Sequence, residues 1–253
     1  MGVGMVAKLK AAFRSLVPSV VLRQWARLKN QRTTSNADVR AIFTDIYKSN
    51  RWGGEAGEFF SGSGSDAATA CDFVDTVNAF IAENGVRSVV DLGCGDFRVG
   101  SRIAGPGLDY IGIDIVEDLI ARNNTAFGGD GVRFVCLNII EDALPEAELC
   151  LMRQVLQHLS NDQITKILQK ISRYPFAIIA EHHPDPARFV GPNLDKAVGS
   201  DVRVYSDSGV YPDHPPFSLE GVEVLCRTTP SKWLLSSDEA ITTYLVRNKR
   251  WEN

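Results

Sequence analysis

The chain has 253 residues, 44% of them hydrophobic, and a formal net charge of −4 at pH 7. This length suits one large α/β domain with extensions, and no apolar run reaches the roughly 18–20 residues that a membrane-spanning helix needs. The five cysteines are scattered and form no Cys-x-x-Cys pair, so we expect reduced thiols in a cytoplasmic protein.

The first 32 residues carry seven basic side chains and no acidic one, whereas the rest of the chain is acidic. We therefore treat residues 1–34 as a basic N-terminal arm. Apolar side chains recur at roughly helical spacing over residues 7–29, a pattern typical of amphipathic segments that contact an anionic membrane. A helix packed on the domain and a frayed arm are the alternatives. The acidic body disfavours nucleic acid as a partner.

Residues 35–68 predict a helical cap followed by a lid loop. Ser35 can cap a helix over about 36–48, whose apolar face is Val39, Ile42, Phe43 and Ile46. Glycine and serine dominate the stretch that follows, which favours a mobile loop. Three side chains of this region suit substrate binding: Tyr47, Arg51 and Trp52. A loop that is flexible and chemically rich is typical of a lid, with a plain linker as the alternative.

Residues 69–253 alternate between strand and helix patterns. Ser65 can cap a helix that ends at Asn84-Gly85. The later pattern predicts strands near 88–92, 109–113, 132–137, 149–152, 177–181, 222–228 and 240–247, and helices near 97–104, 116–127 and 161–172. This rhythm favours an α/β fold with a mostly parallel sheet covered by helices on both faces.

The stretch Ser88-Val-Val-Asp-Leu-Gly-Cys-Gly95 organises this domain. A buried strand runs into a turn where Gly93 and Gly95 allow a ligand to approach the backbone. A second strand ends in Asp114, which follows Asp91 by 23 residues. An acid about 20 residues beyond such a turn suits the two hydroxyl groups of a bound ribose.

The insert at residues 182–219 departs from the strand–helix rhythm. It is rich in proline and polar side chains, and an insert of this length inside a compact domain is usually functional. Because it follows the fifth strand, we expect it to fold over the strand ends as a substrate lid between the fifth and sixth strands.

These motifs resemble those of class I S-adenosylmethionine-dependent methyltransferases. Val90-Asp-Leu-Gly-Cys-Gly95 is similar to the first motif of that family, Ile111-Gly-Ile-Asp114 to the second, Phe134-Val-Cys-Leu-Asn138 to the third, and Leu151–Leu159 to the segment after the fourth strand. The resemblance implies a Rossmann-like seven-stranded sheet with an antiparallel last strand. It also implies S-adenosyl-L-methionine as the cofactor.

Carried over position by position, the resemblance assigns cofactor contacts. Gly93 and Gly95 would line the methionine part, Asp91 would hold its amino group, and Asp114 would accept both ribose hydroxyls. Asn138 would accept a hydrogen bond from the adenine amino group, although the family usually has Asp there. The full predicted set is Asp91, Gly93, Cys94, Gly95, Asp114, Ile115, Asn138, Ile139 and Arg153. Arg98 stands where a nicotinamide-binding G-x-G-x-x-G turn needs glycine, which disfavours a dehydrogenase.

The outer segments resemble bacterial methyltransferases of glycan assembly. These segments are Ile46-Tyr47 with Arg51-Trp-Gly, the Glu181-His182 strand end, and Pro192-Asn-Leu-Asp-Lys196. The resemblance implies an O-methyltransferase acting on a hydroxyl of a small or lipid-linked acceptor, a sugar of surface-polysaccharide biosynthesis. N- or carboxyl methylation of another metabolite and a non-catalytic cofactor-binding module are the alternatives.

Methyl transfer to a sugar hydroxyl needs a base, and histidine suits that role near neutral pH. Three histidines stand at strand ends that face the expected crevice: His158, His182 and His183. Lys196, Arg203 and Arg51 can bind an anionic acceptor, with solvated loop charges as the alternative. No spacing of three metal ligands is visible around Glu181, so we expect no metal site.

Overall fold

The structure is a computed structural model that describes residues 38–230 and 236–248. The basic arm at 1–34, its proposed membrane segment at 7–29, and the predicted cap Ser35 lie outside the described residues.

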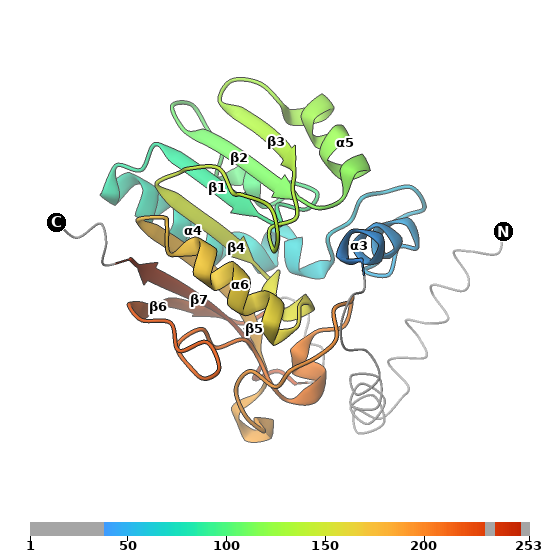
Figure 1. Cartoon of the computed structure of the whole chain (residues 1–253), viewed down its shortest axis with the longest axis vertical. Coiled ribbons are helices and arrows are strands. Elements are labelled where there is room, and N and C mark those ends of the chain that lie inside the picture. Colours follow the sequence, from blue (N-terminus) through green and yellow to red (C-terminus); the bar gives the residue numbers. More distant parts are fainter. Residues whose placement is uncertain (1–37, 231–235, 249–253) are drawn as a thin grey trace.

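A seven-stranded sheet forms the centre of the molecule, in the order β3-β2-β1-β4-β5-β7-β6 (Figure 1). Its strands are β1 (Ser88–Leu92), β2 (Asp109–Asp114), β3 (Val132–Cys136), β4 (Leu149–Arg153), β5 (Phe176–His183), β6 (Val222–Thr228) and β7 (Ala240–Arg247). Strands β1 to β5 pair in parallel, while β7 pairs antiparallel with both β5 and β6. The predicted Rossmann-like mixed sheet is confirmed.

Helices cover both faces of the sheet because both faces are apolar. In β1, Val89 and Val90 are each fully buried, yet they belong to two different core clusters on opposite sides. The apolar side of α4 (Ala67–Asn84) joins the first cluster, and that of α6 (Asn161–Ile171) joins the second. The third sheet helix is α5 (Glu117–Phe127), which packs on β2 and β3. Strands buried on both sides are typical of parallel sheets.

The helix ends show why some boundaries differ from the predicted ones. Asp38 caps α3 (Val39–Lys48) by accepting hydrogen bonds from two backbone N–H groups of the first turn, so the predicted Ser35 cap is corrected. Helix α4 begins at Ala67 and ends, as predicted, at Gly85 in the left-handed conformation. The helix predicted near 97–104 is wrong: the structure has only a 3₁₀ turn there, η2 (Gly100–Arg102), and Phe97, at the predicted start of the helix, has a φ of 67°, outside the helical region.

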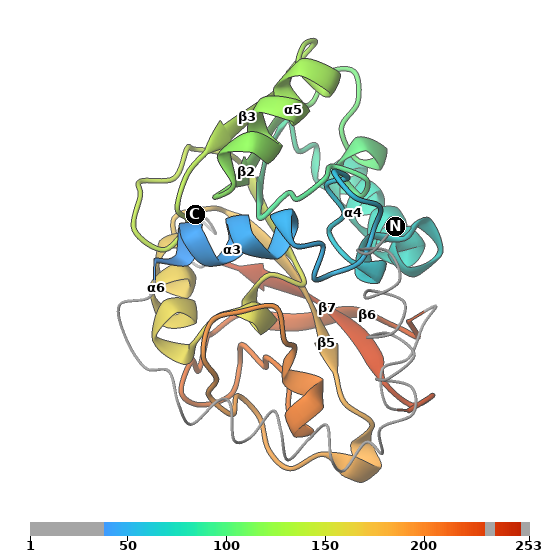
Figure 2. The same ribbon diagram turned by 90° about the vertical axis from the view of Figure 1, so that its right-hand side faces the viewer.

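Helix α3 crosses the carboxyl-terminal edge of the parallel strands, between α5 and the insert (Figure 2). The guanidinium of Arg40 fixes it there by donating to the carbonyl oxygen of Ile115 at 2.8 Å, just beyond β2. Tyr47, near the helix end, is buried against Val116 and Leu119. The predicted helical cap therefore lies over the edge where ligands of α/β sheets bind.

The connection between β5 and β6 also packs at this edge. Strand β5 extends to His183, so the predicted insert at 182–219 begins two residues inside the strand. The short turns η4 (Pro186–Arg188) and η5 (Arg203–Ser206) interrupt an irregular chain. Buried Asn193 organises it: its amide nitrogen donates to the carbonyl oxygens of Tyr211, His214 and Pro215. Such internal hydrogen bonds allow a loop without regular structure to be buried.

Glu181 in β5 makes the stability of the fold sensitive to pH. Its carboxylate is fully buried and accepts hydrogen bonds from the backbone N–H groups of Leu156 and Gln157 at 2.9 and 3.2 Å. Burial outweighs these bonds and raises the pKa of Glu181 from 4.5 to about 7. The folded chain thus holds this proton more tightly than the unfolded chain. Stability is therefore lost as pH rises from about 4.5, where the unfolded chain ionises, to about 7, where Glu181 ionises in the fold.

We expect Glu181→Gln to flatten the pH dependence of folding. Between about pH 5 and about pH 8, the free energy of unfolding should fall by about 2 kcal/mol more in the wild type than in the variant. Urea denaturation at both pH values measures this. Glu146→Gln is the control, because its side chain is 92% exposed. Equal slopes for wild type and Glu181→Gln would contradict the prediction.

Candidate functional site

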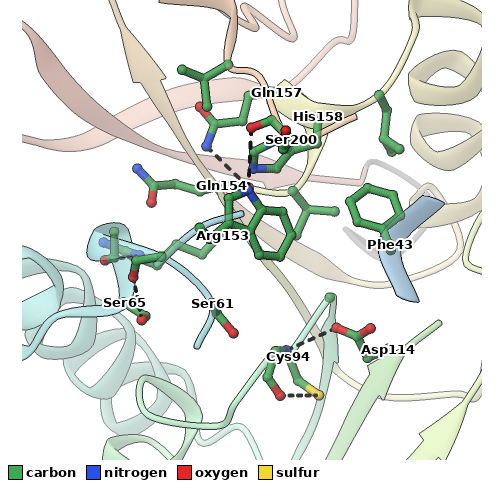
Figure 3. Close-up of a pocket in the computed structure, with 18 of the residues that line it drawn as sticks. Phe43, Ser61, Ser65, Cys94, Asp114, Arg153, Gln154, Gln157, His158 and Ser200 are labelled. Atoms are coloured by element: carbon green, nitrogen blue, oxygen red, sulfur yellow. Dashed lines mark hydrogen bonds between the residues drawn. The ribbon is translucent and has the colours of Figure 1, made fainter. Parts of the chain in front are cut away.

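A cavity of about 340 Å³ opens where α3, the lid loop and the insert meet the carboxyl ends of the parallel strands. Figure 3 shows Cys94 and Asp114 toward one end of it and Gln157, His158 and Ser200 toward the other. Of the predicted site residues, the cavity is lined by Tyr47, Arg51, Trp52, Asp91, Gly93, Cys94, Gly95, Asp114, Ile115, Asn138, Ile139, Arg153, His158 and His182. Parts of the chain predicted separately therefore form one site.

The glycine turn after β1 forms one wall of the cavity. The backbone N–H groups of Gly93 and Cys94 both donate to the carbonyl oxygen of Ile113, at 2.7 and 2.9 Å, which fixes the turn against β2. Gly93 and Gly95 have φ values of 80° and 55°, a region that favours glycine. A Cβ on Gly95 would overlap the Ser61 hydroxyl oxygen. Only glycine permits this close approach of turn and lid loop.

Two buried carboxyl groups lie beside the glycine turn. Asp114 accepts hydrogen bonds from the backbone N–H groups of Gly95 and Val116, at 3.2 and 3.1 Å. Asp91 accepts one from the Tyr110 hydroxyl. Burial raises the pKa of both carboxyl groups to about 6, and the hydrogen bonds oppose that rise. Both groups are therefore predominantly ionised at neutral pH, and each can accept hydrogen bonds from a ligand.

Asn138 follows β3 and faces the same part of the cavity. Its side-chain oxygen accepts a hydrogen bond from the backbone N–H of Ile140 at 3.0 Å, and the backbone N–H of Asn138 donates to the Asp142 carboxylate at 2.8 Å. A carbonyl oxygen has two lone pairs, so Asn138 can accept a second hydrogen bond. Ile115 and Ile139 add apolar surface beside it.

The lid loop is tied to the glycine turn by hydrogen bonds. Ser61 donates its backbone N–H to the Asp96 carboxylate at 3.0 Å, and its hydroxyl oxygen accepts the Asp96 backbone N–H at 2.8 Å. The Tyr47 hydroxyl forms a 2.9 Å hydrogen bond with the same Ser61 hydroxyl. Helix α3 and the lid loop therefore contribute directly to the wall of the cavity.

A cluster of aromatic side chains around Trp52 covers the cavity from the α3 side. The Trp52 ring lies 5.2 Å from the rings of Tyr47 and His158, and 6.1 Å from that of Phe43. Its indole N–H donates to the Ser200 carbonyl oxygen at 3.4 Å, which joins the lid loop to the insert. Trp52 thus links two segments that are 148 residues apart in the chain.

The three candidate histidines have different environments. His158 lies against Trp52 and Phe43, and burial lowers its pKa to about 3, so it is neutral. His182 lines the cavity on the α4 side. His183 does not line it: its ring stacks on Tyr211 at 4.1 Å, its nitrogens lie 2.9 Å from the Thr242 hydroxyl and the Val210 carbonyl oxygen, and burial lowers its pKa to about 4.

The predicted basic side chains all have partners within the protein. Lys196 and Arg203 are buried outside the cavity lining, and donate to backbone carbonyl oxygens: Lys196 to His158 and Ala197, Arg203 to Leu194 and Leu159. Arg51 borders the cavity, but its guanidinium pairs with Asp45 at 2.6 Å. These charges hold the loops in place.

Arg153 and two glutamines form a polar wall. The Arg153 guanidinium donates to the carbonyl oxygens of Gly64 and Thr69, at 2.7 and 3.3 Å, and burial lowers its pKa to about 10. Gln154 and Gln157 also line the cavity, and the side-chain oxygen of Gln157 is buried without a hydrogen-bond partner among residues 38–230 and 236–248. We did not predict either glutamine, because a glutamine beside a strand end carries no distinctive sequence signal.

Residues 38–230 and 236–248 contain neither a cluster of metal ligands nor a membrane-spanning helix. No group of three or more His, Cys, Asp and Glu side chains in these ranges is placed to hold a metal ion. Nor does either range contain a helix with the length and apolarity needed to cross a membrane.

Comparison with known proteins identifies the domain around this cavity. Residues 89–174 match the family model described as "Methyltransferase domain". No curated protein matches the chain.

Solved structures share the fold at low identity. Magnesium protoporphyrin IX methyltransferase (ChlM) from Synechocystis PCC 6803 with bound SAM is 16% identical, with a TM-score of 0.51 over 85% of this chain and 100% of that one. The N-methyltransferase NodS from Bradyrhizobium japonicum WM9, in complex with S-adenosyl-L-homocysteine, is 15% identical, with a TM-score of 0.50 over 72% and 87% of the two chains. At these identities the likeness concerns the fold.

The domain match, the fold and the cavity together define the class of protein: a methyltransferase with the class I fold. Its methyl donor is S-adenosylmethionine. The residues present fit this donor, because a glycine turn with no room for a Cβ and two buried carboxyl groups border the same cavity.

We expect Gly95→Ala to loosen the lid loop from the glycine turn. The added Cβ meets the Ser61 hydroxyl, and the left-handed backbone disfavours alanine, so we expect a loss of about 2 kcal/mol of stability. Chemical denaturation measures it. Gly105→Ala is the control, since a Cβ there has no neighbour within 4 Å. The prediction fails if the two variants lose equal stability.

Proposed function

We propose that the protein transfers a methyl group from S-adenosylmethionine to a hydroxyl group of a neutral acceptor, a sugar of glycan biosynthesis. One observation carries this proposal: the cavity has the two buried carboxyl groups at one end, and at the other a polar and aromatic wall in which the Arg153 guanidinium is bonded to backbone carbonyl oxygens. The acidic end suits the cofactor, and the second end suits a hydroxyl-rich acceptor.

At the acidic end, the chain's own groups match the donor's polar parts. The Asp114 carboxylate would accept hydrogen bonds from the vicinal ribose hydroxyls, and Asp91 would hold the amino group of the methionine part. Asn138 would accept a bond from the adenine amino group, with Ile115 and Ile139 beside the ring. Gly93, Cys94 and Gly95 would line the methionine part, where a side chain on either glycine would obstruct the cavity.

At the other end, three features support a sugar. The buried Gln157 oxygen lacks a hydrogen-bond donor among the described residues, and a hydroxyl group supplies one. Trp52 offers an aromatic face, with Tyr47 beside it. Lys196 and Arg203 are occupied by backbone carbonyls, so a neutral acceptor is favoured over an anionic one. The outer segments that resemble glycan methyltransferases agree with this acceptor class.

For this reaction the protein has to position the acceptor hydroxyl and remove its proton. The bound donor supplies an activated methyl group. The acceptor hydroxyl must lie in line with that group, and a base must take its proton. His158 and His182 are the candidate histidines on the cavity, whereas His183 lies behind it.

Two alternatives make distinct predictions. An N- or carboxyl-methyltransferase needs less help from a base, so its turnover would survive the loss of both cavity histidines. A non-catalytic binding module would bind the cofactor and methylate no acceptor.

Peripheral contact with the inner face of a membrane, through residues 7–29, is a further proposal that would suit a lipid-linked acceptor. Its test is sedimentation with anionic vesicles.

Calorimetric titration with S-adenosylmethionine tests the acidic end. We expect Asp114→Ala to weaken binding at least tenfold, the scale of one lost charge-assisted hydrogen bond. Wild-type affinity should also fall below about pH 6, because protonated Asp114 loses accepting capacity. Asp118→Ala is the control, since that side chain is 65% exposed. Unchanged binding by folded Asp114→Ala would contradict the ribose assignment.

A screen of methyl glycosides tests the other end. S-adenosylhomocysteine formation reports turnover, and we expect Gln157→Leu to lower kcat/KM for the best glycoside about tenfold, the scale of one hydrogen bond. Cofactor affinity should stay within about twofold. Gln169→Leu, on the exposed face of α6, is the control. Cofactor binding by wild type without turnover of any glycoside would contradict a sugar acceptor.

A further inference from the structure

His182 has a buried carboxylate beside it that the sequence motifs do not reveal. His182 pairs in register with Ile241 of β7, and Glu239 lies just before that strand. The Glu239 carboxylate oxygen Oε2 is 3.1 Å from Nε2 of His182, and the two residues are only 2% and 5% exposed. A buried carboxylate at this distance interacts strongly with an imidazole ring.

The Glu239 carboxylate is held in one orientation. Its second oxygen, Oε1, accepts the backbone N–H of Ser236 at 3.1 Å. The Ser236 hydroxyl in turn donates to the Asp185 carboxylate at 2.8 Å, which ties this turn to the chain that follows β5. Oε2 is therefore directed to the histidine. A base oriented by a third group is a recurring arrangement in enzymes that activate a nucleophile.

His182 also lines the cavity, together with Thr69, Phe73 and Arg153. Within the part of the chain that the structure describes, neither ring nitrogen of His182 makes a hydrogen bond of regular geometry, although Oε2 of Glu239 is 3.1 Å from the buried Nε2. The other cavity histidine differs, because Nδ1 of His158 lies 3.2 Å from the Gly199 carbonyl oxygen and burial lowers its pKa to about 3, although the charge of Asp201 opposes that fall. His182 has a buried carboxylate oxygen 3.1 Å from its ring, which can stabilise a proton there.

We propose that His182 is the general base for methyl transfer and that Glu239 is its positioning residue; this rests on the proposed hydroxyl acceptor. The acceptor oxygen forms its bond to the methyl carbon while its proton passes to Nδ1 of His182. The electron pair of the broken carbon–sulfur bond stays on the donor's sulfur. The Glu239 carboxylate, whose Oε2 lies 3.1 Å from Nε2, stabilises the imidazolium that results.

The charges around the pair agree with this role. Arg153 is the cation that borders the same part of the cavity, and its guanidinium is already bonded to Gly64 and Thr69. Asp91 and Asp114 lie near the glycine turn, and His183 faces the opposite side of β5. Glu239 is the carboxylate placed to receive the positive charge of His182.

A ring-proton measurement tests the pair without any acceptor. In proton NMR of the full chain labelled with nitrogen-15 histidine, we expect a downfield, slowly exchanging Nε2–H resonance that His182→Asn removes. Glu239→Gln should move it upfield and speed its exchange. Absence of this resonance in the wild type, or an unchanged resonance in Glu239→Gln, overturns the pairing.

Turnover of the best methyl glycoside tests the role. We expect His182→Asn and Glu239→Gln to lower kcat about 100-fold, a typical general-base contribution, while KM and cofactor affinity stay within about threefold. Glu239→Asp should restore part of kcat. The control is Glu223→Gln, an exposed glutamate on β6. If Glu239→Gln fails to fold, His182→Asn and Glu239→Asp carry the test.

The outcomes separate this inference from the proposed function. Unchanged kcat in folded His182→Asn, with a wild type that methylates the glycoside, overturns the base assignment and leaves the O-methyltransferase standing. A wild type that methylates no glycoside overturns the acceptor class, and the ring-proton resonance still decides the pair.

Discussion

The site depends on one constraint, the hydrogen bonds that fix the glycine turn against the neighbouring strand. Gly93 and Cys94 both donate to the Ile113 carbonyl oxygen, so the end of β1 cannot separate from the end of β2. This brings Asp91 and Asp114, which are 23 residues apart in the chain, to the border of one cavity. The carboxyl groups are buried there at a cost in desolvation, which appears as a raised pKa in each. A ligand that donates hydrogen bonds to them recovers part of that cost.

The lid loop and the insert complete the wall of the cavity at the edge of the sheet. Ser61 bonds the lid loop to Asp96 in the glycine turn, and Trp52 bonds the same loop to Ser200 in the insert. The two ends of the cavity are thus mechanically linked through one loop. Binding at the acidic end and binding at the polar end should therefore influence each other, because the lid loop contributes to the wall at both ends.

Buried charge has two uses in this fold. Arg203 and Lys196 satisfy backbone carbonyls of loops that have no regular structure, which is a structural use. Glu239 and His182 form a pair at the cavity wall, where a change of protonation can be part of a reaction. The difference lies in the partner: a carbonyl group cannot exchange a proton, whereas a carboxylate beside an imidazole stabilises one.

The sequence by itself determined the sheet, the helices that cover it except the one expected near 97–104, and the acidic end of the site. Hydrophobic periodicity located all seven strands, and the glycine turn with its following acid located Asp91 and Asp114, because these signals are local in the chain. Only the tertiary structure decided which histidine meets the cavity, since His182 and His183 are adjacent and differ only in the face of β5 to which each belongs. It also decided that Lys196 and Arg203 serve the loops, and that Glu239 lies beside His182 from 57 residues away. Such pairings depend on strand register and loop packing, which no local pattern encodes.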